Sequence, residues 1–226
     1  MADLDGGTIV GADGVERCWW CGDDPLYVAY HDDDWGRPIR DERELFELLC
    51  LEGFQAGLSW ITILRKRDAF RSAFAGFDVA AVARFGADDV ARLLLDPGIV
   101  RHRGKITATI ANAQAVESMW SQGTTLTEIV WSHAPLPRVA AMGARGDVPG
   151  LSEESTELAR VLRRWGMRFV GPTTVYAFMQ SAGLVDDHLA GCHRSGTGAA
   201  ARRGVARAAK ALPVAAKRRP AKPAET

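Results

Sequence analysis

The sequence predicts an all-α fold, and three observations carry this prediction. Apolar residues recur with helical spacing along most of the chain, and residues typical of helix starts and ends bracket these runs. No segment alternates polar and apolar residues for long enough to indicate a sheet. The chain has 226 residues, of which 47% are hydrophobic, so it can bury one sizeable core. We expect a flexible leader over 1–16, a folded body over 17–193 and a disordered basic tail over 195–226.

The first two helices of the body are expected to begin at short polar side chains. Asp41, with Glu44 three residues later, is a typical N-terminus and precedes an apolar run with helical spacing. A second helix is expected to begin near Ser59 and to continue through Phe70.

Three further helices are expected, two before a turn and one after it. Asp78 caps a short helix, and residues 88–95 form the next one. The turn Asp96-Pro97-Gly98 ends that helix, and a longer helix follows from about 106 to 119.

The sequence of the last part of the body predicts an irregular connection over 134–150, followed by two more helices. Ser152 opens a helix that closes at Gly166. Pro172 occupies the first turn of a final helix that closes at Gly183.

Charge is distributed unevenly, although 28 basic and 28 acidic residues balance over the whole chain. From Arg194 onward there are nine basic residues and one acid, so the tail is strongly basic. No run of about 18 or more apolar residues occurs, and the first residues are acidic and rich in glycine, unlike a secretory signal. We therefore expect a soluble cytoplasmic protein.

Four cysteines are too few for a disulfide scaffold, and they indicate core residues or metal ligands. Cys18 and His31 lie near the start of the body, and His188 and Cys192 lie four positions apart near its end. If this last pair is helical, both side chains share one face and can bind the same ion. Four nitrogen and sulfur ligands suit tetrahedral zinc in a structural role. Spacing alone leaves open that these residues form no common site, or that the ligands include others among Cys21, His102, His133 and His193.

Cys50, inside an apolar run, is expected in the core.

Aromatic residues concentrate near the start of the body: Trp19, Trp20, Tyr27, Tyr30, Trp35 and Trp60. Most aromatic residues in proteins are core residues, and this alternative stays open for each of them. Glu52 is more informative, because its spacing places a carboxylate on the inward face of its helix. A buried carboxylate is costly unless it is paired or functional, so a salt bridge to an arginine is the structural alternative.

The segment Pro97–Lys105 joins two expected helices through a glycine turn. Backbone N–H groups near Gly98, beside Arg101, Arg103 and Lys105, can bind a phosphate of a nucleic acid. Glycine turns between helices are common, so this motif is weak by itself.

Five segments together resemble one family: Arg17-Cys18-Trp19-Trp20, Asp24 to Asp32, Glu52 to Trp60, Arg101 to Lys105, and Phe169 to Cys192. In sequence and order they are similar to the DNA-3-methyladenine glycosylase I family, bacterial base-excision repair enzymes of the helix-hairpin-helix superfamily. The resemblance covers roughly 16–193. It implies a helix-hairpin-helix glycosylase fold, with that motif near 88–119 and a zinc site that joins the N- and C-terminal segments.

The resemblance also implies roles for particular residues. It assigns the structural zinc to Cys18, His31, His188 and Cys192. It assigns the lesion pocket to Trp20, Tyr27, Tyr30, Trp35 and Trp60, with Glu52 as the recognition or catalytic carboxylate. It assigns the DNA contacts to a wedge of Gly57, Leu58 and Ser59 and to a hairpin that includes Gly98, Arg101, Arg103 and Lys105.

The implied activity is repair of alkylated double-stranded DNA by a monomer. The enzyme would flip out 3-methyladenine and hydrolyse its N-glycosidic bond, leaving an abasic site. The residues leave open a glycosylase for another alkylated or damaged purine, and a non-catalytic, zinc-stabilised DNA-binding module. A zinc hydrolase is disfavoured, because four protein ligands leave no position for water.

Overall fold

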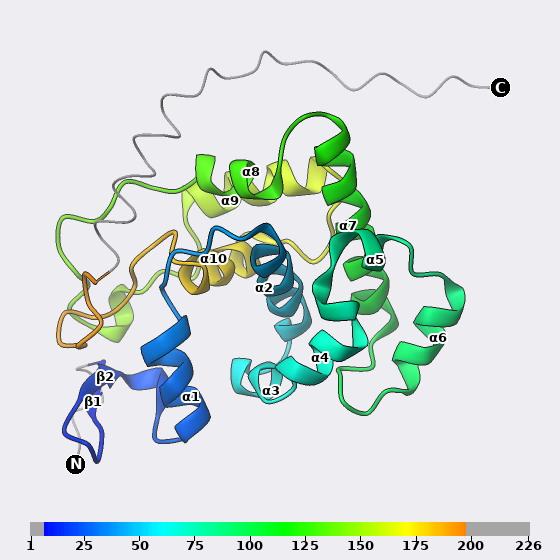
Figure 1. Ribbon diagram of the computed structural model, residues 1–226. Helices are drawn as coiled ribbons and strands as arrows, with labels where there is room; N and C mark the ends of the chain where they lie inside the picture. Colours follow the sequence, from blue (N-terminus) through cyan, green and yellow to red (C-terminus); the bar gives the residue numbers. More distant parts are fainter. Residues whose placement is uncertain (1–6, 198–226) are drawn as a thin grey trace.

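The computed structural model describes residues 7–197, and it confirms the all-α class. Within these residues the only sheet has two strands of three residues each. Figure 1 shows these elements in order: β1 (Thr8–Val10), β2 (Glu16–Cys18), α1 (Pro25–Ala29), α2 (Glu42–Gln55), α3 (Trp60–Leu64), α4 (Arg67–Ala73), α5 (Val79–Ala83), α6 (Ala87–Leu95), α7 (Arg103–Ser121), α8 (Leu126–Ser132), α9 (Glu153–Arg164) and α10 (Pro172–Ser181).

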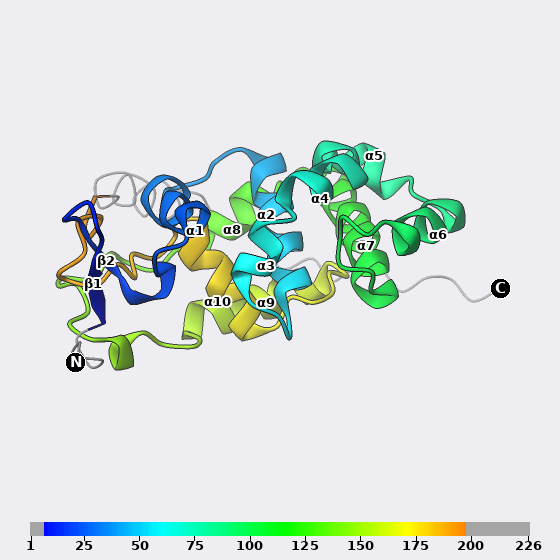
Figure 2. The ribbon, with the colours of Figure 1, turned by 90° about the horizontal axis from the view of Figure 1, so that it is seen from below.

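The molecule is elongated. Figures 1 and 2 show the β1–β2 hairpin and α1 at one end, α6 at the other, and α2 with α10 between them. In the part of the chain that the structure describes, no helix is long and apolar enough to cross a membrane.

Three predicted helix starts are confirmed, each by a side-chain oxygen that accepts a hydrogen bond from the third residue beyond it. Asp41 accepts from the backbone of Glu44 at 3.0 Å, and Asp78 accepts from Ala81 at 2.7 Å. Ser152 accepts from Ser155 at 3.1 Å. Each bond satisfies an N–H that has no partner inside its helix, which is why these residue types could be recognised in the sequence.

Other helix boundaries differ from the prediction. The helix expected from Ser59 to Phe70 is divided into α3 and α4, because Lys66 leaves the helical backbone at φ −105° and ψ 1°. Its ammonium donates to the carbonyls of Pro97 and Gly98 at 3.0 and 3.2 Å, which ties this break to the distant turn. The sequence interpretation also missed α8, although Thr125 and Glu128 form a capping box there.

The β1–β2 hairpin lies where we expected a flexible leader up to residue 16. Its strands pair antiparallel, with Ile9 opposite Arg17. Arg17 is buried between the carboxylates of Asp13 and Asp32, each 2.8 Å away, so the hairpin is attached to the body. Strands of three residues are too short to show an alternating pattern, and Asp32 is distant in sequence. Most of the expected basic tail, from residue 198, lies outside the described residues.

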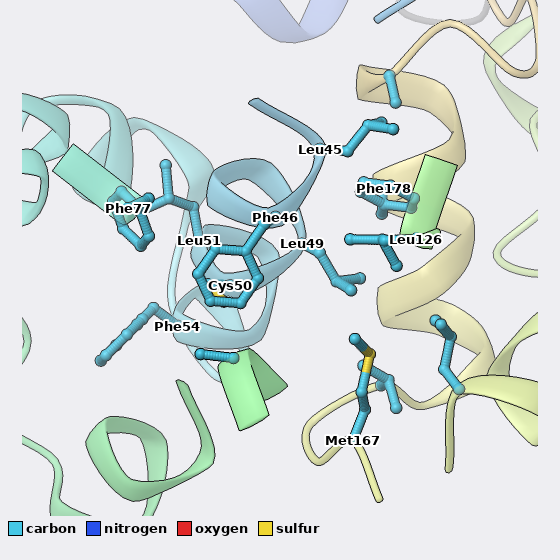
Figure 3. Close-up of a cluster of buried hydrophobic side chains, with 14 of the residues drawn as sticks. Leu45, Phe46, Leu49, Cys50, Leu51, Phe54, Phe77, Leu126, Met167 and Phe178 are labelled. Atoms are coloured by element: carbon cyan, nitrogen blue, oxygen red, sulfur yellow. The ribbon is translucent and has the colours of Figure 1, made fainter. Parts of the chain in front are cut away.

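The core forms around α2, which packs against α3, α7, α8 and α10. Figure 3 shows Phe46 and Leu49 of α2 among apolar side chains from neighbouring elements, including Phe178 of α10. Cys50 lies in this core, as predicted. Because most of α2 is buried, the residues near its C-terminus are held rigidly, and Glu52 is one of them.

Candidate functional site

The four residues proposed as zinc ligands converge into one buried cluster. Cys18 ends β2, His31 lies in a short π-helical segment after α1, and His188 and Cys192 follow α10. Their ligand atoms all lie within 4.8 Å of one another. The Cys192 sulfur is 3.4 Å from His31 Nε2 and 3.6 Å from His188 Nδ1. Two sulfur and two nitrogen atoms at this spacing could hold one metal ion, so the donor set fits the implied zinc.

The reasoning that paired His188 with Cys192 on a helix was wrong. Residues 186–189 have no helical structure, and the two residues are brought together by an irregular segment. Gly183, with φ +71°, ends α10 in the left-handed conformation. Beyond it, buried Asp187 accepts hydrogen bonds from Tyr176 and Gln180 at 2.7 and 2.8 Å, which fixes the path of the chain.

Surrounding residues orient the cluster. His31 Nδ1 lies 2.7 Å from Asp32 Oδ1, which leaves Nε2 directed toward the sulfur of Cys192. Burial acts to raise the pKa of Asp32, but hydrogen bonds from Arg17 and His31 outweigh it and lower that pKa. Hydrogen bonds from Cys18 and the two histidines lower the pKa of the Cys192 thiol, whereas its hydrogen bond with Cys192 and its burial raise the pKa of Cys18.

The rival ligands are placed elsewhere. Cys21 directs its thiol to the carbonyl of Cys18 at 3.2 Å, and His102 accepts from the backbone of Lys105 as the N-cap of α7. His133 lies 2.8 Å from the carbonyl of Ile129, and His193 contacts Asp32 at 3.5 Å. None of these four belongs to the cluster found among the described residues.

A cavity of about 240 Å³ lies beside this Cys/His cluster. Its lining includes all the residues proposed for the lesion pocket: Trp20, Tyr27, Tyr30, Trp35, Trp60 and Glu52. The ring of Trp20 is 5.1 Å from that of Tyr27 and 4.9 Å from that of Trp35, and Tyr30 is 5.4 Å from Trp60. The structure therefore brings these aromatic residues together around one opening rather than dispersing them through the core.

The cluster of Cys18, His31, His188 and Cys192 contacts the walls of this cavity. The His31 ring lies 5.2 Å from the ring of Trp20, and the His188 ring lies 4.6 Å from that of Trp35. His31 and His188 are thus each in contact with one cavity tryptophan, so the Cys/His cluster and the aromatic walls of the cavity pack against one another.

Glu52 has an unusual environment for a carboxylate. It is only 3% exposed, and its Oε1 accepts a hydrogen bond from Ser181 of α10 at 2.8 Å. Within the described residues, Oε2 has no hydrogen-bond partner, and neither has the indole nitrogen of Trp60. Burial raises the pKa of Glu52 to about 8, with the bond from Ser181 acting in the opposite direction. No described arginine pairs with it, so the structural alternative of a buried salt bridge is wrong.

The sequence interpretation missed the polar residues that α10 adds to this cavity. Gln180 and Ser181 lie in an apolar helix, and Asp187 follows it. A polar residue on the buried side of an apolar helix predicts a site residue, as it does for Glu52 in α2, and Gln180 and Ser181 show the same pattern in α10.

The proposed wedge lies just beyond α2. Gly57 has φ +80°, a conformation that favours glycine, and the following Leu58 is 44% exposed. Ser59 is the N-cap position of α3, and its hydroxyl is 2.8 Å from that of Thr62. A tight turn that holds a leucine in solvent is suited to entering a base stack.

The hairpin residues divide into two groups. Arg101 lies between α6 and α7 and Arg103 begins α7, and both are exposed. Gly98 is partly exposed, so all three residues can reach a partner. Lys105 differs from the expectation, because it is 8% exposed and its ammonium donates to the carbonyls of Phe54 and Ala56 at 2.8 and 2.5 Å. It stabilises the end of α2 before the wedge, so its ammonium is not at the surface to bind phosphate.

Comparisons with known proteins agree with this geometry. The family model described as methyladenine glycosylase matches residues 20–195. DNA-3-methyladenine glycosylase 1 of Escherichia coli (strain K12) is 48% identical over 179 residues, which are 79% of this chain and 96% of that protein. A crystal structure of 3-methyladenine DNA glycosylase I has a TM-score of 0.76 at 47% identity, covering 78% of this chain and 98% of that one.

A second solved structure contains a bound base. It is a variant of 3-methyladenine DNA glycosylase I in complex with 3-methyladenine, with a TM-score of 0.75 at 36% identity, and it covers 79% of this chain and 97% of that one. The family model and the relatives span nearly all of the folded part of this chain. The chain belongs to the methyladenine glycosylase family.

Proposed function

We propose that this protein is a DNA glycosylase that removes 3-methyladenine from double-stranded DNA by hydrolysing the N-glycosidic bond. The observation that carries the proposal is Glu52, a buried carboxylate with one unpartnered oxygen in an aromatic cavity. The relatives support the substrate, because they are named for 3-methyladenine and one solved relative contains it. A non-catalytic DNA-binding module would gain nothing from this costly arrangement.

Recognition depends on charge. Methylation at N3 gives the adenine a delocalised positive charge, which neutral adenine lacks. The faces of Trp20, Tyr30 and Trp60 attract such a cation, by roughly 0.5–2 kcal/mol for each contact. Burial favours the protonated form of Glu52 in the empty cavity, whereas a cationic base favours the ionised form, which attracts that base directly. The unpartnered Oε2 can accept a hydrogen bond from the exocyclic amine.

The chemical step uses the same charge. Water forms a bond to C1′ of the deoxyribose while the C1′–N9 bond breaks. The electron pair of the C1′–N9 bond stays on the base and neutralises it, and the attacking water releases its extra proton to the solvent. Glu52 stabilises the positive charge that develops on the sugar, because a carboxylate in a dry cavity acts through a low dielectric. The rest of the cavity orients the base and excludes other water molecules from its faces.

The DNA is held by two segments of the body. Leu58, with Gly57 and Ser59, fills the gap left by the flipped nucleotide. The helix-hairpin-helix near 88–119 supplies Gly98, Arg101 and Arg103 to the phosphate backbone. The glycosylase body extends over 17–193, and it acts as a monomer in the cytoplasm.

Cys18, His31, His188 and Cys192 hold one zinc ion in this proposal. With four protein ligands, zinc supplies structural stability and no reactive water. It joins segments that are 170 positions apart in the sequence, at Cys18 and His188, so it closes a long loop of the unfolded chain.

Chromatography of the base released from methylated DNA tests the function. The expected product is free 3-methyladenine, released by the wild-type protein and strongly reduced in Glu52→Gln. Release of a different methylated purine in its place would overturn the substrate assignment, and release of no base would overturn the enzymatic function.

A further inference from the structure

Phe169 is a large aromatic side chain that remains partly exposed in the turn between α9 and α10. It is 39% exposed, whereas Met167 and Val170 on either side of it are buried. Its φ is +56°, a left-handed conformation that is rare for a residue of this size. The strained backbone and the exposed apolar ring both cost free energy, and neither stabilises the protein by itself. This combination therefore indicates that the ring has a role at the surface.

A buried side chain from α7 holds this turn rigid. The amide nitrogen of Asn112 donates to the carbonyl of Arg168 at 3.2 Å, and its amide oxygen accepts from the N–H of Arg168 at 2.8 Å. Both backbone polar groups of Arg168 are therefore bound by one side chain. The ring of Phe169 is positioned by this contact before any partner arrives.

The ring lies beside both segments proposed to contact DNA. A β-carbon at Gly53 of α2 would be 3.3 Å from Cβ of Phe169, and one at Gly104 of α7 would be 3.9 Å from its Cζ. The ring centroid is also 6.3 Å from that of His102. Phe169 thus bridges the end of α2, which leads into the wedge turn at Leu58, and the start of α7, which follows the hairpin.

The charges around Phe169 suit a polyanion. Arg168 is exposed next to it, and Arg101 and Arg103 are exposed at the nearby start of α7. The segments that meet at Phe169 therefore carry three exposed arginines and two exposed apolar side chains, Phe169 and Leu58. Proteins that kink duplex DNA combine these features, inserting apolar side chains between bases while basic residues bind the phosphates.

We propose that Phe169 is a second insertion residue, which contacts the base opposite the flipped nucleotide while Leu58 fills the gap on the other strand. This inference rests on the proposed function. Extrusion of a nucleotide leaves its partner base without a pair, and a rigid aromatic ring can stack against the exposed face of that base. Arg168 binds a phosphate beside it.

The test uses Phe169→Asn, because asparagine tolerates the left-handed backbone and removes only the ring. Leu136→Asn is the matched control: it removes an apolar side chain that is 65% exposed in a separate groove near Tyr176. The probe is a duplex with a tetrahydrofuran abasic site opposite 2-aminopurine. We expect the wild type and the control to raise 2-aminopurine fluorescence, because insertion separates that base from its neighbours.

For Phe169→Asn we expect roughly tenfold weaker binding of the duplex and loss of the fluorescence rise. Its melting temperature and its affinity for free 3-methyladenine should equal those of the wild type. Unchanged duplex affinity and fluorescence would overturn the inference, and so would weaker binding accompanied by an equal loss of affinity for the free base. The wild type is assayed in parallel for release of 3-methyladenine. Failure of that release overturns the proposed function, whereas normal release with an unaffected variant overturns only the role of Phe169.

Discussion

Replacement of Glu52 by glutamine separates the contributions of its charge and its shape. Glutamine has nearly the same size and can keep the hydrogen bond with Ser181, but it cannot carry the negative charge. The structure predicts opposite effects of this change on stability and on activity. Replacement of a residue with only a structural role would lower stability and leave the activity per folded molecule unchanged.

The effect on stability follows from the pKa of Glu52, which burial raises from 4.5 to about 8. Below pH 4.5 both the folded and the unfolded chains hold the proton, so the group has no differential effect. Between pH 4.5 and 8 only the unfolded chain ionises readily, so the wild type loses stability as the pH rises. The full loss above pH 8 is at most roughly 5 kcal/mol, at about 1.36 kcal/mol per pKa unit.

Glu52→Gln should avoid this loss, so at pH 9 it should melt at a higher temperature than the wild type, by up to about 10–20 °C. At pH 4 the two proteins should melt at similar temperatures. Glu44→Gln removes the same charge from an exposed position of α2 and serves as the control, with little change in melting temperature at either pH.

Single-turnover excision of 3-methyladenine on the same preparations measures activity. We expect Glu52→Gln to reduce it roughly ten- to a thousandfold, equivalent to the loss of one charge-assisted contact of about 1.5–4 kcal/mol. Glu44→Gln should excise at the wild-type rate. A Glu52→Gln protein that is less stable but fully active would refute the pocket assignment.

Three further predictions follow from the other parts of the structure. Cys18→Ser should lose the bound zinc and lower the melting temperature, and equal zinc by elemental analysis in variant and wild type would contradict the ligand assignment. Lys105→Met should cost roughly 1–3 kcal/mol in denaturant unfolding, because the carbonyls of Phe54 and Ala56 lose their donor. If Lys105 instead bound phosphate, its loss would reduce the salt dependence of DNA binding without destabilising the protein. Truncation of residues 195–226 should flatten the salt dependence of DNA binding and leave the choice of lesion unchanged, and an unchanged slope would show that the basic tail does not engage phosphates.

The sequence by itself determined the class of the fold and most helix starts. Asp41, Asp78 and Ser152 were recognisable because a cap satisfies backbone groups within three residues of itself, so its signal is local. The sequence also predicted that Glu52 faces the core, because the helical spacing of the apolar residues in its own helix is enough to show which side is buried. The ligand set and the pocket aromatics came from the resemblance of ordered motifs to a family.

Only the tertiary structure decided how distant segments meet. Ser181 is the partner of Glu52 across 129 positions, and this pairing, rather than an arginine, leaves Oε2 available to a ligand. Lys105 turns inward because the carbonyls at the end of α2 lie within its reach, which no local pattern records. His188 and Cys192 converge through an irregular segment that Gly183 and Asp187 direct. Local hydrogen bonds and periodicity are encoded within a few residues, whereas these contacts depend on packing between elements that the chain brings together only when it folds.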